Sequence, residues 1–183
     1  MEIIFLKILI VLLFLPERLM NLGYCFMQEQ AENLTLLEIK IMRALQENGR
    51  LSNAELAKLV GISTSSCWNH TQRLFKIGAI LDVRARINPS MVQRDTVVLV
   101  GVVLDRSTPD SFQAFEQAAG DLENVLECYL VAGEVDYFLK IRVKDLAAFN
   151  RFHSEKIIAL PGVRQVRTFF VLNEVKTDGM LAF

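Results

Sequence analysis

The chain has 183 residues, of which 52% are apolar and 22% are charged, and its formal net charge is −1. This length allows one domain or two small ones, and the composition argues against disorder over most of the chain. The three cysteines, Cys25, Cys67 and Cys128, are single and widely spaced, which excludes a disulfide framework and a CxxC pair. Such cysteines suit a reducing compartment, so we expect a cytoplasmic protein.

The small net charge conceals an uneven distribution along the chain. Residues 1–33 carry two basic and four acidic side chains, residues 34–94 carry nine and four, and residues 95–183 carry nine and thirteen. The three segments therefore have net charges of −2, +5 and −4. A basic segment beside an acidic one is typical of a phosphate-facing module joined to a non-binding module, although chance scatter gives the same sums.

An apolar run, IIFLKILIVLLFL, occupies residues 3–15. It is shorter than the roughly 20 apolar residues of a membrane span, and it lacks the basic lead and small-residue cleavage site of a secretory signal. Three interpretations remain: a start codon chosen too far upstream, a weak membrane anchor, and a helix that packs on the body of the protein. We favour the first, with Met27 as the functional start, and treat residues 1–33 as an extension outside the core.

Residues 34–94 are predicted to form a helix-turn-helix domain with a linker strand. Capping signals at Thr35, Ser52 and Ser63 predict the starts of three helices with apolar positions at helical spacing. The expected stops are Gly49, Gly61 and Gly78. The short glycine turn between the second and third helices is the helix-turn-helix arrangement, although plain helical bundles also contain such pairs.

The third predicted helix carries the side chains best suited to contact DNA. Its hydroxyls, amides, imidazole and guanidinium all suit base edges or phosphates, and the free amides at its start favour a phosphate. The alternative is that its serines and threonine only cap the helix and that Trp68 covers the core. We expect Cys67 to pack in the interior rather than to act as a reactive thiol. With two positions from the start of the second helix, the candidate DNA-binding residues are Ser52, Asn53, Ser63, Thr64, Ser65, Ser66, Trp68, Asn69, His70, Gln72, Arg73 and Lys76.

The rest of the chain alternates strands and helices. An alternating pattern over residues 80–87, closed by Asn88 and Pro89, predicts the half-buried linker strand. The order that follows is β-α-β-β-α-β, the ferredoxin-like pattern of an antiparallel sheet with two helices on one face. The predicted elements are 97–104, 108–120, 125–132, 136–143, 145–160 and 163–175. We therefore expect an α+β protein, with a winged helix-turn-helix domain over 34–94 and a ferredoxin-like αβ-sandwich domain over 95–183.

The sequence offers no catalytic, metal or cofactor motif. Its nine glycines are too widely spaced for a phosphate-binding loop. His153 and Glu155 have the HxE spacing of zinc deaminases, but the companion PCxxC is missing. The two histidines, His70 and His153, lie in different predicted domains, which leaves no nucleophile paired with a base. We expect no enzymatic activity, no metal site and no cofactor.

Several motifs in the right order resemble the Lrp/AsnC family of feast/famine regulators over roughly residues 34–178. Separate motifs in sequence are more specific than any one of them. The matching segments are GRLSNAELAKLVGIS at 49–63, a helix with Ser63, Cys67, Arg73 and Leu74 that ends in GAI at 78–80, NP at 88–89, ECYLVAGEVDYFLKIRV at 127–143, LPGV at 160–163 and TFFVLNEVK at 168–176.

The resemblance implies a transcription regulator that binds double-stranded DNA and responds to an amino acid or related small metabolite through its assembly or operator affinity. It implies a homodimer formed by the αβ domains, which assembles further into an octamer, and an amino acid bound between αβ domains. No stable membrane association is expected. The effector residues that the resemblance implies are Leu130, Gly133, Asp136, Tyr137, Leu146, Phe169 and Phe170.

The GEVDY segment suits such a site chemically. Gly133 lets backbone amides approach a carboxylate, and Asp136 is able to accept an α-ammonium. The alternative is a hairpin turn in which the aspartate caps the backbone.

The chain departs from the family pattern at His70 and Gln72, where relatives often carry arginines. Phosphate attraction is then expected to rely more on Arg73, Lys76, Arg84 and Arg86. Two rival functions stay open: an amino-acid sensor without DNA binding, which the charge of +5 over residues 34–94 argues against, and a membrane-tethered regulator, which the short apolar run argues against.

Overall fold

The computed structural model describes residues 34–106 and 108–183, so the expectations for residues 1–33, including the start at Met27, lie outside the described part of the chain. The described chain divides into two units. Residues 34–86 together with Lys176–Phe183 form the first unit, and residues 87–175 form the second. This division falls at Ile87, earlier than the 94/95 boundary expected from the sequence. Within the described ranges no helix is both long and apolar enough to cross a membrane.

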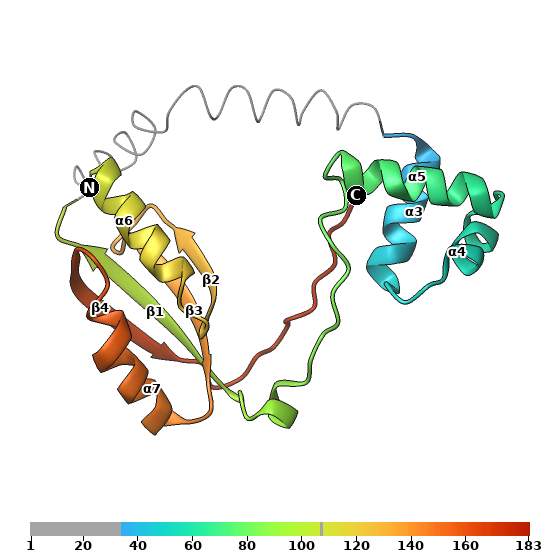
Figure 1. Ribbon diagram of the computed structural model, residues 1–183. Helices are drawn as coiled ribbons and strands as arrows, with labels where there is room; N and C mark the ends of the chain where they lie inside the picture. The colour runs from blue at the N-terminus through green and yellow to red at the C-terminus, as the bar shows by residue number, and fades with distance from the viewer. Residues whose placement is uncertain (1–33, 107) are drawn as a thin grey trace. The chain divides into compact units, whose positions relative to one another are not determined.

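Three helices make the first unit: α3 (Leu36–Glu47), α4 (Asn53–Val60) and α5 (Thr64–Lys76) (Figure 1). Their N-caps are the predicted residues Thr35, Ser52 and Ser63. Each hydroxyl oxygen accepts a hydrogen bond from a backbone N–H in the first turn of its helix, which satisfies a group that the helix leaves free. Local chemistry thus determines where the three helices begin.

The ends of these helices agree less well with the prediction. Gly61 caps α4 with a φ of +79°, a conformation open to glycine, and this reverses the chain into α5. Helix α3 instead ends at Glu47, followed by Asn48 in an extended conformation, and Gly49 does not adopt a positive φ. The predicted left-handed stop at Gly49 is therefore wrong.

The core of this unit lies where the three helices meet. Cys67 and Leu74 of α5 are fully buried there, so the prediction that Cys67 packs in the interior is confirmed. Burial of one face of α5 leaves its opposite face directed to solvent. The buried apolar residues are Ile41, Ala44, Leu56, Ala57, Cys67 and Leu74.

The segment after α5 does not form the predicted strand over residues 80–87. A strand requires a hydrogen-bonded neighbour, and no ladder involves this segment in the described chain. Its apolar side chains Leu81, Val83 and Ile87 are exposed. The segment is held instead by Arg86, which donates to Thr177 Oγ1 at 2.6 Å and pairs with Asp178 at 3.0 Å. A short 3₁₀ helix, η1 (Pro89–Val92), follows.

The second unit is a four-stranded antiparallel sheet with helices on one face (Figure 1). Its strands stand in the order β2-β3-β1-β4, which confirms the ferredoxin-like β-α-β-β-α-β prediction. The elements are β1 (Thr96–Leu104), α6 (Pro109–Gly120), β2 (Val125–Leu130), β3 (Tyr137–Val143), α7 (Leu146–Phe152) with the π-helical turn η2 (His153–Ile157), and β4 (Val163–Phe170).

Alternation along β1 and β3 separates the two faces of this sheet. Every second residue of β3, from Tyr137 to Val143, is buried beneath the helices with Phe115 of α6 and Phe149 of α7. Strand β4 ends at Phe170, short of the predicted 175, and its last ladder partner is Val98, near the start of β1. No helix of the described residues packs on the other sheet face, which contributes much of the exposed surface described below.

Candidate DNA-binding helix and effector surface

The solvent face of α5 gathers most of the predicted DNA-binding side chains. Thr64 lies exposed at its start, and Arg73 and Lys76 lie exposed in its last turn. Trp68 is 55% exposed, so the alternative in which it covers the core is wrong. The central stripe has the three- and four-residue spacing of one helix face, and its exposed members are Ser65, Trp68, Asn69, Gln72 and Lys76.

The polar residues at the starts of α4 and α5 bind one another. Ser63 Oγ accepts from Ser66 N at 3.2 Å and lies 3.2 Å from Ser65 Oγ. Asn53 Nδ2 donates to the Thr64 carbonyl oxygen at 2.8 Å, which joins the start of α4 to the start of α5. Ser52 Oγ donates to Glu55 Oε2 at 2.6 Å. These polar groups therefore have structural partners already, and their predicted contacts with DNA stay predictions.

Glu38 is the residue that the sequence analysis missed. It completes a capping box with Thr35, and its side chain is 1% exposed and faces α5. Its Oε1 accepts from Arg73 Nη1 at 2.6 Å and lies 3.2 Å from His70 Nδ1. Its Oε2 accepts from Thr35 N at 2.9 Å and from Thr35 Oγ1 at 3.0 Å. The available signal was its helical spacing from Ile41, which places both on the inner face of α3.

The hydrogen bonds around Glu38 keep it ionised inside the protein. Burial alone would raise the pKa of this carboxyl, but the donors Thr35, His70 and Arg73 outweigh burial and lower the pKa from 4.5 to about 2. A buried carboxylate with donors to both oxygens links the first turn of α3 to the middle of α5.

Most of the cations expected to attract phosphate are already paired. Arg73 binds Glu38, Arg84 pairs with Asp82 at 2.6 Å, and Arg86 pairs with Asp178. Lys76 makes no ion pair with any of the described residues. It is therefore the strongest candidate for a direct phosphate contact at this end of α5.

In the second unit, Asp136 holds the loop between β2 and β3. Its side chain is 5% exposed, and its Oδ2 accepts from Leu104 N at 2.8 Å. Its backbone N–H donates to the Val102 carbonyl oxygen at 2.8 Å, and its carbonyl accepts from Val131 N at 2.9 Å. The alternative role of this aspartate as a backbone cap thus has direct support, with the bond reaching β1 rather than its own turn.

Tyr137 faces the helices. It is 1% exposed, and its hydroxyl donates to Glu116 Oε1 at 2.7 Å. Its ring lies 4.5 Å from that of Phe115 and 6.0 Å from that of Phe112, between centroids. Burial and the neighbouring Glu116 carboxylate raise the pKa of Tyr137 well above its usual range. The side chain is therefore part of the core beside α6.

The remaining predicted effector residues are accessible but do not form one cluster. Leu130 ends β2, and the partly exposed Gly133 lies in the loop beyond it. Phe170 contacts Phe149 of α7, with ring centroids 5.3 Å apart, whereas Phe169 contacts Phe138 at 6.4 Å and lies on the other face. Strands β2 and β4 are the two edges of the sheet, separated by about 14 Å at ordinary strand spacing. The accessible apolar side chains among them are Leu130, Leu146, Phe169 and Phe170.

Cross-strand pairs define the sheet face opposite the helices. One row runs Tyr129, Phe138, Gly101 and Arg167, and the next runs Glu127, Lys140, Leu99 and Phe169. Glu127 and Lys140 form an ion pair at 2.9 Å, while Tyr129 and Phe169 are about half exposed. Aromatic and aliphatic side chains thus line a surface that also carries paired charges.

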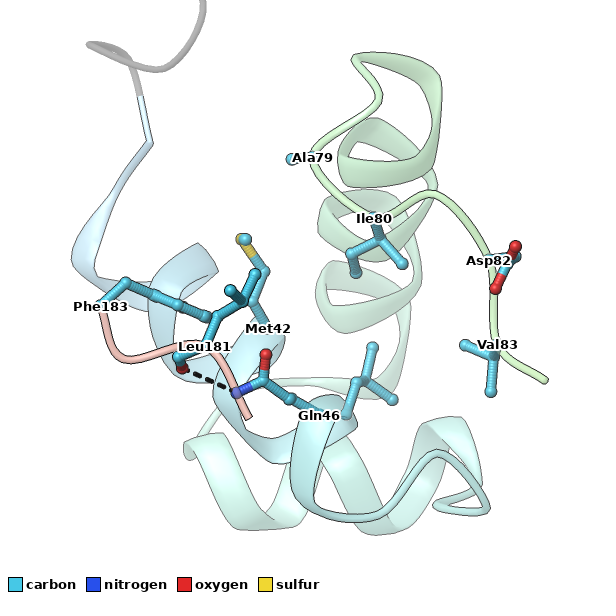
Figure 2. Close-up of a pocket in the computed structure, with 9 residues that line it drawn as sticks. Met42, Gln46, Ala79, Ile80, Asp82, Val83, Leu181 and Phe183 are labelled. Carbon is cyan, nitrogen blue, oxygen red and sulfur yellow. Dashed lines mark hydrogen bonds between the residues drawn. The ribbon is translucent and has the colours of Figure 1, made fainter. Parts of the chain in front are cut away.

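Two pockets, one in each unit, contain none of the predicted site residues. In the first unit, a pocket of about 200 Å³ lies between α3, the segment after α5 and the C-terminal tail, and Gln46 Nε2 donates to the Leu181 carbonyl oxygen at 2.9 Å (Figure 2). Its lining includes Met42, Gln46, Ile80, Asp82, Val83, Leu181 and Phe183. In the second unit, a pocket of about 330 Å³ lies beside η1 and includes Arg94 and Arg142. Arg142 there is bound to both oxygens of Glu174.

Comparison with known proteins matches both units. Residues 34–80 match the family described as winged helix-turn-helix DNA-binding, and residues 97–181 match the Lrp/AsnC ligand binding domain. The chain is 40% identical over 148 residues to the leucine-responsive regulatory protein of Haemophilus influenzae, covering 81% of this chain and 89% of that protein. It is 39% identical over 150 residues to the protein of the same name from Escherichia coli, covering 82% and 92%.

Solved structures give the same result. A transcriptional regulator from Neisseria meningitidis in complex with L-Met superposes with a TM-score of 0.74 at 32% identity, covering 79% of this chain and 94% of that one. An AsnC family transcriptional regulator from Agrobacterium tumefaciens superposes with a TM-score of 0.76 at 32% identity, covering 81% and 97%. At these coverages the similarity extends over both units rather than one of them.

Replacing Asp136 should destabilise the second unit. We expect Asp136→Ala to lower the free energy of unfolding by about 1–3 kcal/mol, because the buried Leu104 N–H loses its acceptor, and Asp136→Asn to lower it less because an acceptor remains. Urea unfolding of both variants measures the effect. Glu134→Ala, which changes an exposed carboxylate of the same loop, is the control. An Asp136→Ala variant as stable as the wild type would contradict this role.

The Glu38 interactions should also give the first unit an acid-dependent stability. Because the carboxyl has a lower pKa in the folded chain than in the unfolded one, its stabilisation is complete above about pH 4.5 and is lost as the pH falls toward 2. The difference in unfolding free energy between wild type and Glu38→Gln should therefore shrink by about 2–3 kcal/mol from about pH 6 to about pH 2. Urea unfolding across this range tests it, and a difference independent of pH would exclude the proposed ionisation.

Proposed function

This chain belongs to the Lrp/AsnC family of transcriptional regulators, and on that premise we propose that it reads DNA with the exposed face of α5 and adjusts this binding through its ligand-binding unit. It is a DNA-binding regulator that responds to amino acids. The family is one of transcription regulators rather than enzymes. A DNA-binding function also supports the cytoplasm as its place of action.

The single observation that carries the DNA-binding residues is the exposed stripe on α5. Trp68, Asn69 and Gln72 project from the second helix of a helix-turn-helix pair, whose other face is fixed in the core by Cys67 and Leu74. Such a helix is presented to the major groove by the helix that precedes it. Asparagine and glutamine are suited to adenine edges, and Lys76 at the end of the stripe is suited to a phosphate.

For the effector, we propose a site that a second copy of the chain completes. Among its predicted residues, Leu130 on β2 and Phe169 and Phe170 on β4 lie on opposite edge strands of one sheet, too far apart for one amino acid to contact both groups. The sheet face that carries Leu99, Tyr129 and Phe169 is open to a partner. Pairing of this face in a homodimer, and of dimers in an octamer, would bring groups from different copies to one ligand. The L-Met bound to the Neisseria meningitidis regulator supports an amino acid as that ligand.

Lys76→Gln should make DNA binding less dependent on salt. Removing one phosphate contact reduces the slope of log K against log salt concentration by about 0.9. Binding to duplex DNA, measured by fluorescence anisotropy at several salt concentrations, gives the slope. Lys144→Gln, which removes an exposed charge from the ligand-binding unit, should leave it unchanged. An unchanged slope for Lys76→Gln would remove this lysine from the interface, and a wild type that binds no duplex would favour a sensor without DNA binding.

Phe169→Ala should weaken effector binding by about tenfold, since a large apolar side chain buried against a ligand contributes more than about 1.5 kcal/mol. Calorimetric titration with each common amino acid, first on wild type and then on the variant, measures this. Phe75→Ala, on the DNA-binding unit, serves as the matched control. Failure of every amino acid to bind the wild type would contradict the effector proposal, whereas equal binding by Phe169→Ala would show that the site was misplaced.

A further inference from the structure

We propose that Glu38 is a positioning residue for DNA recognition, which acts from the interior of the first unit by fixing His70 and Arg73 of α5. Arg73 then contributes through this ion pair rather than as a direct phosphate contact. The inference rests on the DNA-binding role proposed above for α5. It assigns a role in recognition to a residue on a different helix that does not itself reach the DNA.

The carboxylate of Glu38 contacts two residues of α5. One oxygen of Glu38 lies 2.6 Å from Arg73 Nη1 and 3.2 Å from His70 Nδ1, and the other is held by Thr35. His70 and Arg73 lie about one helical turn apart on α5, so a single carboxylate contacts two successive turns of this helix. A point of attachment at both turns resists rotation of α5 about its own axis as well as sliding along it. The stripe of Trp68, Asn69 and Gln72 depends on that rotation.

Burial of the Glu38 carboxylate costs free energy. Removing a carboxylate from water is expensive, and a well-packed apolar residue often serves stability as well as or better than a buried ion pair. Stability alone therefore gives a weak reason for a charge at this position. The partners of Glu38 lie at the edge of the DNA-facing surface, with His70 31% and Arg73 43% exposed, so the ion pair joins the interior to that surface.

Positioning and long-range charge have different, measurable effects on DNA binding. Removing a negative charge from a DNA-binding unit should strengthen its attraction to any DNA. Loss of positioning should weaken binding only where base edges are read. Electrostatics alone thus leaves the ratio of affinities for a specific and an unrelated sequence unchanged, whereas loss of positioning lowers this ratio.

The experiment uses the full chain and a duplex that the wild type selects from a random DNA pool, with a scrambled duplex of equal length for comparison. We expect Glu38→Gln to lower the ratio of specific to scrambled affinity by about tenfold, which corresponds to one hydrogen bond to a charged group. Glu47→Gln removes an exposed carboxylate from the same helix α3 and is the matched control. It should leave the ratio unchanged. Binding is measured well below the unfolding temperature of each variant.

Two further variants separate positioning from folding and from direct contact. Glu38→Asp keeps the charge but withdraws the carboxylate, so it should also lower the ratio, and it carries the test if Glu38→Gln does not fold. The double variant Glu38→Gln with Arg73→Gln should have the ratio and salt slope of Glu38→Gln alone. If the salt slope of the double variant were about 0.9 smaller than that of Glu38→Gln alone, Arg73 would be a phosphate contact and the proposal would be overturned. An unchanged ratio in Glu38→Gln or Glu38→Asp would overturn it too, and a wild type that selects no duplex would overturn the DNA-binding function with it.

Discussion

The arrangement of the DNA-binding unit depends on one buried carboxylate. Apolar contacts among Ile41, Leu56 and Leu74 bring the helices together, but such contacts are not directional and tolerate small rotations. Glu38 adds direction because all four of its hydrogen bonds have fixed partners, two on Thr35 and two on α5. By fixing the rotation of α5, these hydrogen bonds also set the direction in which its exposed stripe faces.

The ligand-binding unit shows the same division between residues that build and residues that remain available. Tyr137 and Asp136 have the chemistry of ligand-binding groups, yet the first is enclosed beside α6 and the second binds the backbone of β1. What remains for a ligand or a second copy is the helix-free face of the sheet and the end of β4. Specificity there is expected to come more from shape and apolar contact than from a buried charge on Asp136.

The sequence predicted what local chemistry controls. Hydroxyl caps at Thr35, Ser52 and Ser63 marked helix starts correctly because a cap needs only neighbours three residues away. The β-α-β-β-α-β order followed equally from hydrophobic periodicity. The errors arose where partners are distant in sequence: the strand over 80–87 has no described neighbour, and the extent of β4 is set by its pairing with the distant strand β1. The inward orientations of Tyr137 and Glu38 likewise depend on residues on other elements.

The return of residues 176–183 to the first unit makes the ligand-binding unit, in topological terms, an insertion within the chain of the DNA-binding unit. Within the described residues the polypeptide passes between the units at 86/87 and at 175/176, and Arg86 joins the two passages through Thr177 and Asp178. The end of β4 therefore has a covalent route back to the helices, and a protease that cuts one passage leaves the units joined by the other.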